Sequence, residues 1–189
     1  WLAAGLFTTA GLLISFGVRR DPRDMSRAFV TPTEAKPLAE IMRRPGVATS
    51  MIAAVSSFAV MAGVMNLAGY VAVGRGHHQG DIYRMISLHI VGMYGLVLVV
   101  GDLIDRFGRR RALSGGLLLM AGSNVALAWF GSVGGMSMAL LALGLGWNFS
   151  YVAATTELVE LTSPSERGRL VGFSDLLSSL VAATLALAG

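Results

Sequence analysis

The chain has 189 residues, of which 54% are hydrophobic and only 14% are charged, and its mean hydropathy is +0.65. Soluble domains carry about 25% charged residues, so this composition excludes an ordinary soluble domain and indicates a protein embedded in a membrane. The net charge of +4 would favour nucleic-acid binding in a soluble chain, but here membrane topology and contact with anionic lipid account for it.

Apolar runs recur along the chain at the length that a membrane requires. A bilayer core about 30 Å thick needs roughly 20 mostly apolar residues per helix. The sequence therefore predicts an all-α, polytopic transmembrane helix bundle. Because the chain begins and ends inside apolar runs, we expect a fragment of a longer protein. The predicted spans are residues 1–18, 45–73, 82–103, 112–131, 136–158 and 170–189.

A long polar segment separates the first predicted span from the others. Residues 19–44 are rich in arginine and interrupted by prolines, which indicates a linker between two helix bundles. Within it, residues 37–43 predict a short amphipathic helix on the membrane surface. We therefore expect the end of a helix at 1–18, a central loop at 19–44 and a bundle at 45–189.

The positions of the basic residues predict the orientation in the membrane. Cytoplasmic loops are rich in lysine and arginine, whereas translocated loops are poor in both. All fifteen such residues except Arg75 and Arg84 lie in the first, third and fifth loops. We therefore expect residues 19–44, 104–111 and 159–169 to face the cytoplasm.

Two charged turns carry a family pattern. Residues 101–110 read GDLIDRFGRR, which matches G-x-x-x-D-R-x-G-R-R, and by this turn the chain resembles the major facilitator superfamily of secondary transporters. Residues 160–172, ELTSPSERGRLVG, are similar to the family's turn after the fourth helix of a half. The resemblance covers most of residues 45–189. It implies the end of a sixth helix, the central loop and helices seven to eleven of a twelve-helix transporter whose N-terminal half is missing here.

The resemblance implies that these turns form a latch, which holds the cytoplasmic side closed through contact with the opposite half and releases when the two bundles rock. Arg109 follows Asp105 by four residues, so the two can pair if helical geometry continues through the turn; Asp102 and Arg106 have the same spacing. We expect the turn's glycines, with Gly168 and Gly172, to allow close backbone approach. The alternative for Arg110 and Arg111 is that they only fix topology and bind lipid headgroups. The expected latch residues are Gly101, Asp102, Asp105, Arg106, Gly108, Arg109, Arg110, Glu160 and Arg167.

Polar and aromatic residues at mid-span are candidates for a substrate cavity. Binding sites in such transporters lie near the bilayer midplane, where Trp147 and Asn148 fall, and Tyr151 follows on the same helical face. Asn66 and His89 are further polar groups within spans, and His89 is a candidate carrier of a coupling proton because histidine titrates near neutral pH. The alternative for each polar group is a purely structural hydrogen bond between helices, and for Trp147 it is packing within the bundle.

The function predicted from these features is secondary active transport of a small molecule in a bacterial inner membrane, driven by a proton gradient and without a cofactor. Lys36, the sole lysine, follows no glycine-rich phosphate loop, and no catalytic motif or close acid pair lies in a span, which disfavours an ATPase and an enzyme. The alternative is a non-transporting bundle of the same fold that acts as a sensor or partner-binding protein. The expected partners are a small-molecule substrate, membrane lipid and the missing half, but not nucleic acid; no metal site is expected, including at His77 and His78.

Overall fold

The computed structural model describes residues 2–17 and 36–188, in which every regular element is a helix. The chain divides into two units, Trp1–Glu34 and Ala35–Gly189. The first unit contains α1 (Leu2–Gly17), an apolar helix of 16 residues, which is shorter than the roughly 20 residues that a span needs. Residues 19–35 of the predicted central loop lie outside the described residues.

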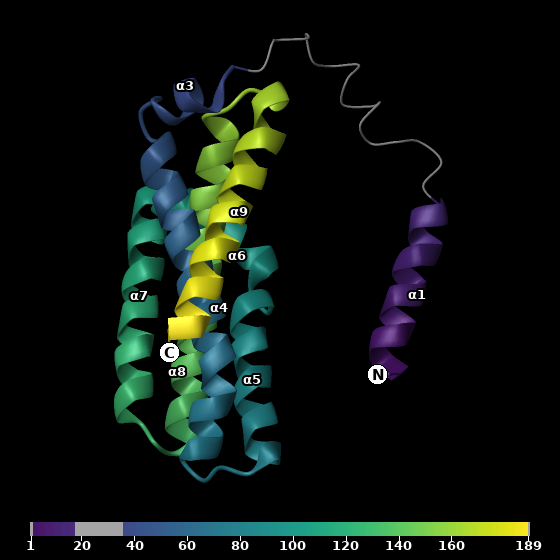
Figure 1. Ribbon diagram of the computed structural model, residues 1–189, viewed down its shortest axis with the longest axis vertical. Coiled ribbons are helices and arrows are strands. Elements are labelled where there is room, and N and C mark those ends of the chain that lie inside the picture. The colour runs from purple at the N-terminus through teal and green to yellow at the C-terminus, as the bar shows by residue number, and fades with distance from the viewer. Residues whose placement is uncertain (1, 18–35, 189) are drawn as a thin grey trace. The chain divides into compact units, whose positions relative to one another are not determined.

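The second unit is a bundle of helices joined by short turns, as Figure 1 shows. Among the described residues, α4, α7, α8 and α9 are long and apolar enough to cross a membrane, and α5 with α6 makes a bent fifth candidate. The prediction of an all-α bundle is confirmed, and the short helix expected within 37–43 is present as α3. The helices are α3 (Leu38–Met42), α4 (Val47–Gly74), α5 (Gln79–Tyr94), α6 (Val97–Phe107), α7 (Arg109–Trp129), α8 (Val133–Glu160) and α9 (Pro164–Ala188).

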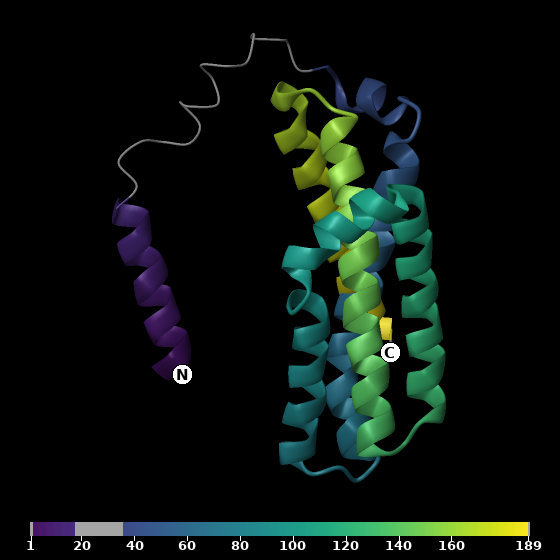
Figure 2. The same ribbon diagram turned by 180° about the vertical axis from the view of Figure 1, so that it is seen from behind.

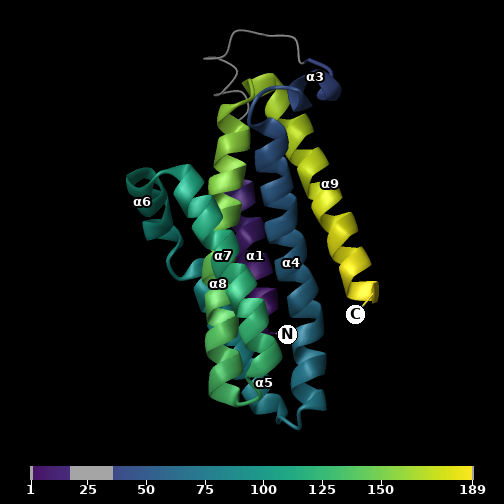
Figure 3. The same cartoon turned by 90° about the vertical axis from the view of Figure 1, so that its left-hand side faces the viewer.

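The bundle is organised around α8, which packs against α4, α5 and α7, while α9 packs mainly on α4 (Figures 2 and 3). Within its apolar stretch, α8 has 61% of its residues buried inside the bundle, whereas α7 has only 17%. Helix α8 is therefore the central helix, and α7 presents most of its surface outward.

Small residues allow α8 to approach α5 closely. A Cβ atom added at Gly144 would lie 2.5 Å from the carbonyl oxygen of His89, and one at Gly92 would lie 2.5 Å from the carbonyl oxygen of Leu141. Both distances are shorter than any real carbon–oxygen contact, so only glycine fits at this crossing. Such crossings are how helices gain packing in a membrane, where lipid is as apolar as the side chains.

A second close crossing joins α8 to α7, where a Cβ atom at Gly146 would lie 2.8 Å from the carbonyl oxygen of Gly116. Sequence analysis predicted close backbone approach at four other glycines, in the two charged turns. Within the described chain that prediction is wrong. No atom lies within 4 Å of a Cβ added at any of those four glycines, namely Gly101, Gly108, Gly168 and Gly172.

The third predicted span, residues 82–103, is not one continuous helix. Helix α5 ends at Tyr94 and α6 begins at Val97, and the axes of Gln79–Tyr94 and Val99–Phe107 differ by 56°. Gly95 lies at the break, and glycine is a poor helix former at which kinks are common. The hydropathy of the run located the segment, although α5 begins before residue 82 and α6 ends after residue 103, and it could not reveal the bend.

Candidate functional site

The two charged turns meet at one end of the bundle, which we call the charged end (residues 36–46, 105–111 and 157–169). Gly108 separates α6 from α7 with a φ of 85°, a conformation that favours glycine. Helical geometry therefore stops at Gly108, and the four-residue spacing no longer places Arg109 beside Asp105. The ion pairs of the described residues include neither that pair nor the expected pair of Asp102 and Arg106.

Arg109 instead joins the two turns. Its guanidinium group donates hydrogen bonds to both carboxylate oxygens of Glu160, and it also donates to Glu157 at 3.1 Å. A guanidinium group that binds a carboxylate through two parallel bonds is held in orientation as well as in position. All three side chains are partly exposed, so the cluster fixes geometry more than it adds stability.

The remaining predicted latch residues have different surroundings. Arg167 donates to the carbonyl oxygen of Val159 at 3.0 Å and so caps the end of α8, where a cation is favoured. Asp105, Arg106 and Arg110 are exposed, and none of their side chains has a hydrogen-bonding or charged partner within the part of the chain that the structure describes. Their partners, if they act in a latch, must come from outside these residues.

A second ion pair at the charged end was not predicted from the sequence. Arg44 donates to both carboxylate oxygens of Glu166, at 2.7 and 2.8 Å, and only 2% of the Glu166 side chain is exposed. This carboxylate also accepts the backbone N–H groups of Ser163 at 3.0 Å and Lys36 at 3.4 Å. The adjacent carboxylate raises the pKa of Arg44 above its ordinary value.

One signal in the sequence could have revealed Glu166. Residues 163–166 read SPSE, which is the capping-box pattern of a serine followed three residues later by a glutamate at the start of a helix. The bond from the Ser163 N–H group to Glu166 is half of that motif. The bonds of Glu166 to Arg44 and Lys36 join segments more than 120 residues apart in the chain, and no local pattern predicts them.

Two predicted cavity residues, Trp147 and Tyr151, lie in a cluster of four aromatic side chains that we call the aromatic cluster. The two rings stack with centroids 5.0 Å apart and planes 12° apart. Tyr94 of α5 meets Trp147 edge-on at 6.3 Å, and Phe58 of α4 lies 6.0 Å from Tyr151. Sequence analysis missed Tyr94 and Phe58 because they come from other helices.

The predicted polar groups divide between the interior and the surface. His89 is 1% exposed, and its Nδ1 lies 2.8 Å from the carbonyl oxygen of Leu140, so it lies within the contact of α5 and α8. Asn148 is also buried, and its Nδ2 has no hydrogen-bond partner among the described residues. Asn66 is exposed and donates to the carbonyl oxygen of Ala62 in its own helix, so it forms no bond between helices in this state.

At the opposite end of the bundle, α7 is capped by side chains from the turn after α4. Arg75 donates to the carbonyl oxygens of Leu127 and Phe130 at 3.0 and 2.7 Å, and His77 contacts that of Gly131 at 2.8 Å. In residues 2–17 and 36–188 no three histidine, aspartate or glutamate side chains are grouped closely enough to hold a metal ion.

This fold defines an integral membrane helix bundle with charged turns after its second and fourth membrane-length segments, counted from α4. The family model of the Major Facilitator Superfamily matches residues 1–186, and the chain belongs to that superfamily.

The chain is similar to several bacterial transport proteins. It is 36% identical over 161 residues to the riboflavin transporter RfnT of Brucella anthropi, a match that covers 85% of this chain and 39% of that protein. It is 33% identical over 188 residues to the uncharacterized MFS-type transporter YdeG of Bacillus subtilis, and 29% identical over 189 residues to YddS of the same organism. Those two matches cover 95% of this chain and 44% and 43% of the relatives, so the chain spans about two-fifths of their length. No solved structure matches the chain.

Proposed function

We propose that the complete protein is a secondary active transporter that moves a small molecule by alternating access, in a bacterial inner membrane with the charged end in the cytoplasm. The observation that carries this proposal is the ion-pair cluster of Arg109 with Glu157 and Glu160, which joins the two charged turns. Membership of the Major Facilitator Superfamily and the names of the relatives support transport rather than an enzymatic reaction.

For the substrate we propose an uncharged molecule with a planar aromatic ring system, of which riboflavin is the first to test. One relative is named a riboflavin transporter. The aromatic cluster supports the same class, since Tyr94 is 57% exposed beside the stacked rings of Trp147 and Tyr151 and offers a ring to a ligand. Aromatic pairs contribute about 0.5–1.5 kcal/mol beyond the area that they bury.

Replacing Tyr94 with leucine is expected to raise the KM for riboflavin uptake by about tenfold, the factor that corresponds to about 1.4 kcal/mol, because one ring of the proposed site is lost. Tyr94→Phe keeps the ring and should keep the KM. Tyr83→Leu is the matched control, because Tyr83 is equally exposed on the same helix but lies outside the aromatic cluster. An unchanged KM in Tyr94→Leu would remove the aromatic cluster from substrate binding.

For the latch we propose that Asp105 contacts the other half of the complete transporter in one conformation and releases it in the other. Asp105 is an exposed carboxylate without a partner in the described chain, at the edge of the membrane. A carboxylate there is unfavourable unless it meets a cation or a helix N-terminus. Arg109, held by Glu157 and Glu160, fixes the turn that presents Asp105.

Asp105→Asn is therefore expected to lower the initial rate of riboflavin uptake by at least about tenfold, while membrane insertion and the midpoint of thermal unfolding stay unchanged because the side chain is exposed. The rates are compared in proteoliposomes that contain equal amounts of the complete protein. Asp81→Asn, an acid-to-amide change at the opposite end, should keep the wild-type rate. A wild-type rate in Asp105→Asn would contradict the latch.

We further propose that a proton gradient drives transport and that no cofactor takes part. His89 is the candidate proton carrier, and the alternative role for it is the bond to Leu140 that holds α5 to α8. Accumulation of riboflavin in proteoliposomes after an imposed pH gradient tests coupling. Complete absence of flux for all substrates, together with specific binding of a protein partner, would favour the alternative of a non-transporting sensor.

A further inference from the structure

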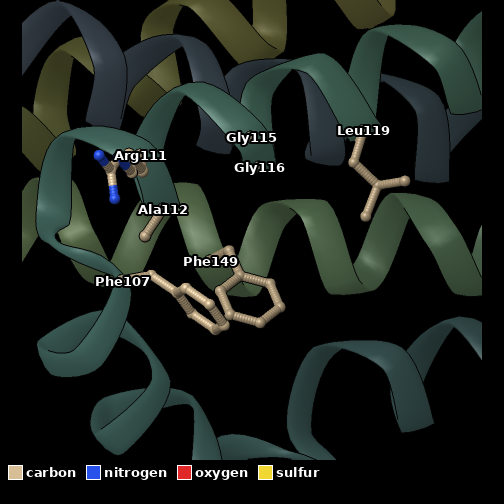
Figure 4. Close-up of a pocket in the computed structure, with 7 residues that line it drawn as sticks. All are labelled: Phe107, Arg111, Ala112, Gly115, Gly116, Leu119 and Phe149. Atoms are coloured by element: carbon tan, nitrogen blue, oxygen red, sulfur yellow. The ribbon is translucent and has the colours of Figure 1, made fainter.

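An apolar groove with one arginine at its end lies between the end of α6, the first half of α7 and α8 (Figure 4). Its volume is about 290 Å³. The residues that line it are Phe107, Arg111, Ala112, Gly115, Gly116, Leu119 and Phe149.

The groove runs along α7 because two glycines leave its floor without side chains. Gly116 packs against the backbone of Ser150 in α8, whereas no atom lies within 4 Å of a Cβ added at Gly115. Figure 4 shows Arg111 at one end of the groove and Leu119 at the other. Leu119 lies eight positions after Arg111, which corresponds to about 12 Å along a helix.

Arg111 supplies the only charged side chain of the lining. It is exposed, and no carboxylate pairs with it in the described part of the chain. By contrast, Arg109 two residues earlier is neutralised by Glu157 and Glu160. The site therefore combines an unneutralised guanidinium group at the membrane edge with an apolar channel beneath it. This combination complements a ligand with an anionic head and an apolar tail.

The location of the groove favours lipid as the source of that ligand. Helix α7 has membrane length, and most of its surface points away from the bundle. The groove therefore opens at a depth where hydrocarbon is the surrounding medium, beside the turn where headgroups begin.

We propose that this groove binds an anionic phospholipid, with its phosphate group at Arg111 and an acyl chain between Phe107 and Phe149 along α7 toward Leu119. The site is independent of the substrate and of the latch, so it does not rest on the proposed transport function.

The test uses the complete protein purified in detergent and incubated with equal amounts of phosphatidylglycerol and phosphatidylcholine, and the bound lipids are counted by native mass spectrometry. The wild-type protein should retain phosphatidylglycerol over phosphatidylcholine. Arg111→Gln should lower bound phosphatidylglycerol by about fivefold, the factor that corresponds to about 1 kcal/mol for one basic residue at a membrane surface. Arg43→Gln removes another exposed charge at the charged end, outside the groove, and should retain lipid as the wild type does.

Gly115→Leu tests the groove separately from the charge. Because a Cβ atom at this position meets no protein atom within 4 Å, the backbone accepts a side chain here and the variant should fold with an unchanged midpoint of thermal unfolding. The rest of the leucine side chain should extend into the groove and lower bound phosphatidylglycerol with Arg111 intact. The proposal would be overturned if the wild type retained the two lipids equally. It would also be overturned if both groove variants retained lipid as the wild type does, or if no lipid were retained because the other half covers the groove.

Discussion

Gly144→Ala in the complete protein is expected to abolish the folded bundle or to lower its stability by about 3 kcal/mol. The added carbon would lie 2.5 Å from the carbonyl oxygen of His89 and 2.9 Å from the backbone nitrogen of Met93. Both are backbone atoms, so no side-chain rotation can relieve the overlap. Helices α5 and α8 would have to separate along the contact that also holds the His89 side chain against Leu140.

The measurement is the yield of monodisperse protein after extraction, followed by the midpoint of thermal unfolding. Gly69→Ala in α4 is the matched control, because no atom lies within 4 Å of a Cβ added there. Since alanine is the better helix former, this control should be neutral or stabilising by up to about 1 kcal/mol. Equal midpoints for the two variants would show that the α5–α8 crossing is not as close as described.

Glu166→Gln is expected to lower the midpoint of thermal unfolding by about 5–10 °C, because it removes the buried charge that Arg44 binds through two hydrogen bonds. The amide that replaces the carboxylate offers one acceptor oxygen instead of two. Arg44 is then left only 30% exposed without its counter-ion, and the N–H groups of Ser163 and Lys36 compete for the remaining acceptor.

A double-mutant cycle separates the ion pair from a general effect of substitution at this site. Arg44→Gln alone should also destabilise, and the double variant with Glu166→Gln should lose clearly less than the sum of the two. Glu40→Gln is the matched control, because Glu40 pairs with Lys36 at the surface and is half exposed. The midpoint of thermal unfolding of this variant should change little. Strict additivity in the cycle would exclude the proposed coupling between the start of α4 and the start of α9.

The sequence by itself determined where most helices lie and to which family the chain belongs. A membrane requires about 20 apolar residues per helix, so hydropathy alone places helices close to α4, α7, α8 and α9. The motif at 101–110 is equally local, since its glycines and charges all lie within one turn. The mid-span positions of Trp147 and Tyr151 also followed from counting residues along one helix.

Only the tertiary structure decided which helix faces meet. The carboxylates that Arg109 binds lie 48 and 51 residues further along the chain, and the carboxylate that Arg44 binds lies 122 residues further along it. The 3.6-residue period of a helix fixes which side chains share a face, but not which face of another helix they contact. For the same reason the close crossing at Gly144, the bend at Gly95 and the place of Tyr94 beside Trp147 depend on how the helices pack against one another in three dimensions.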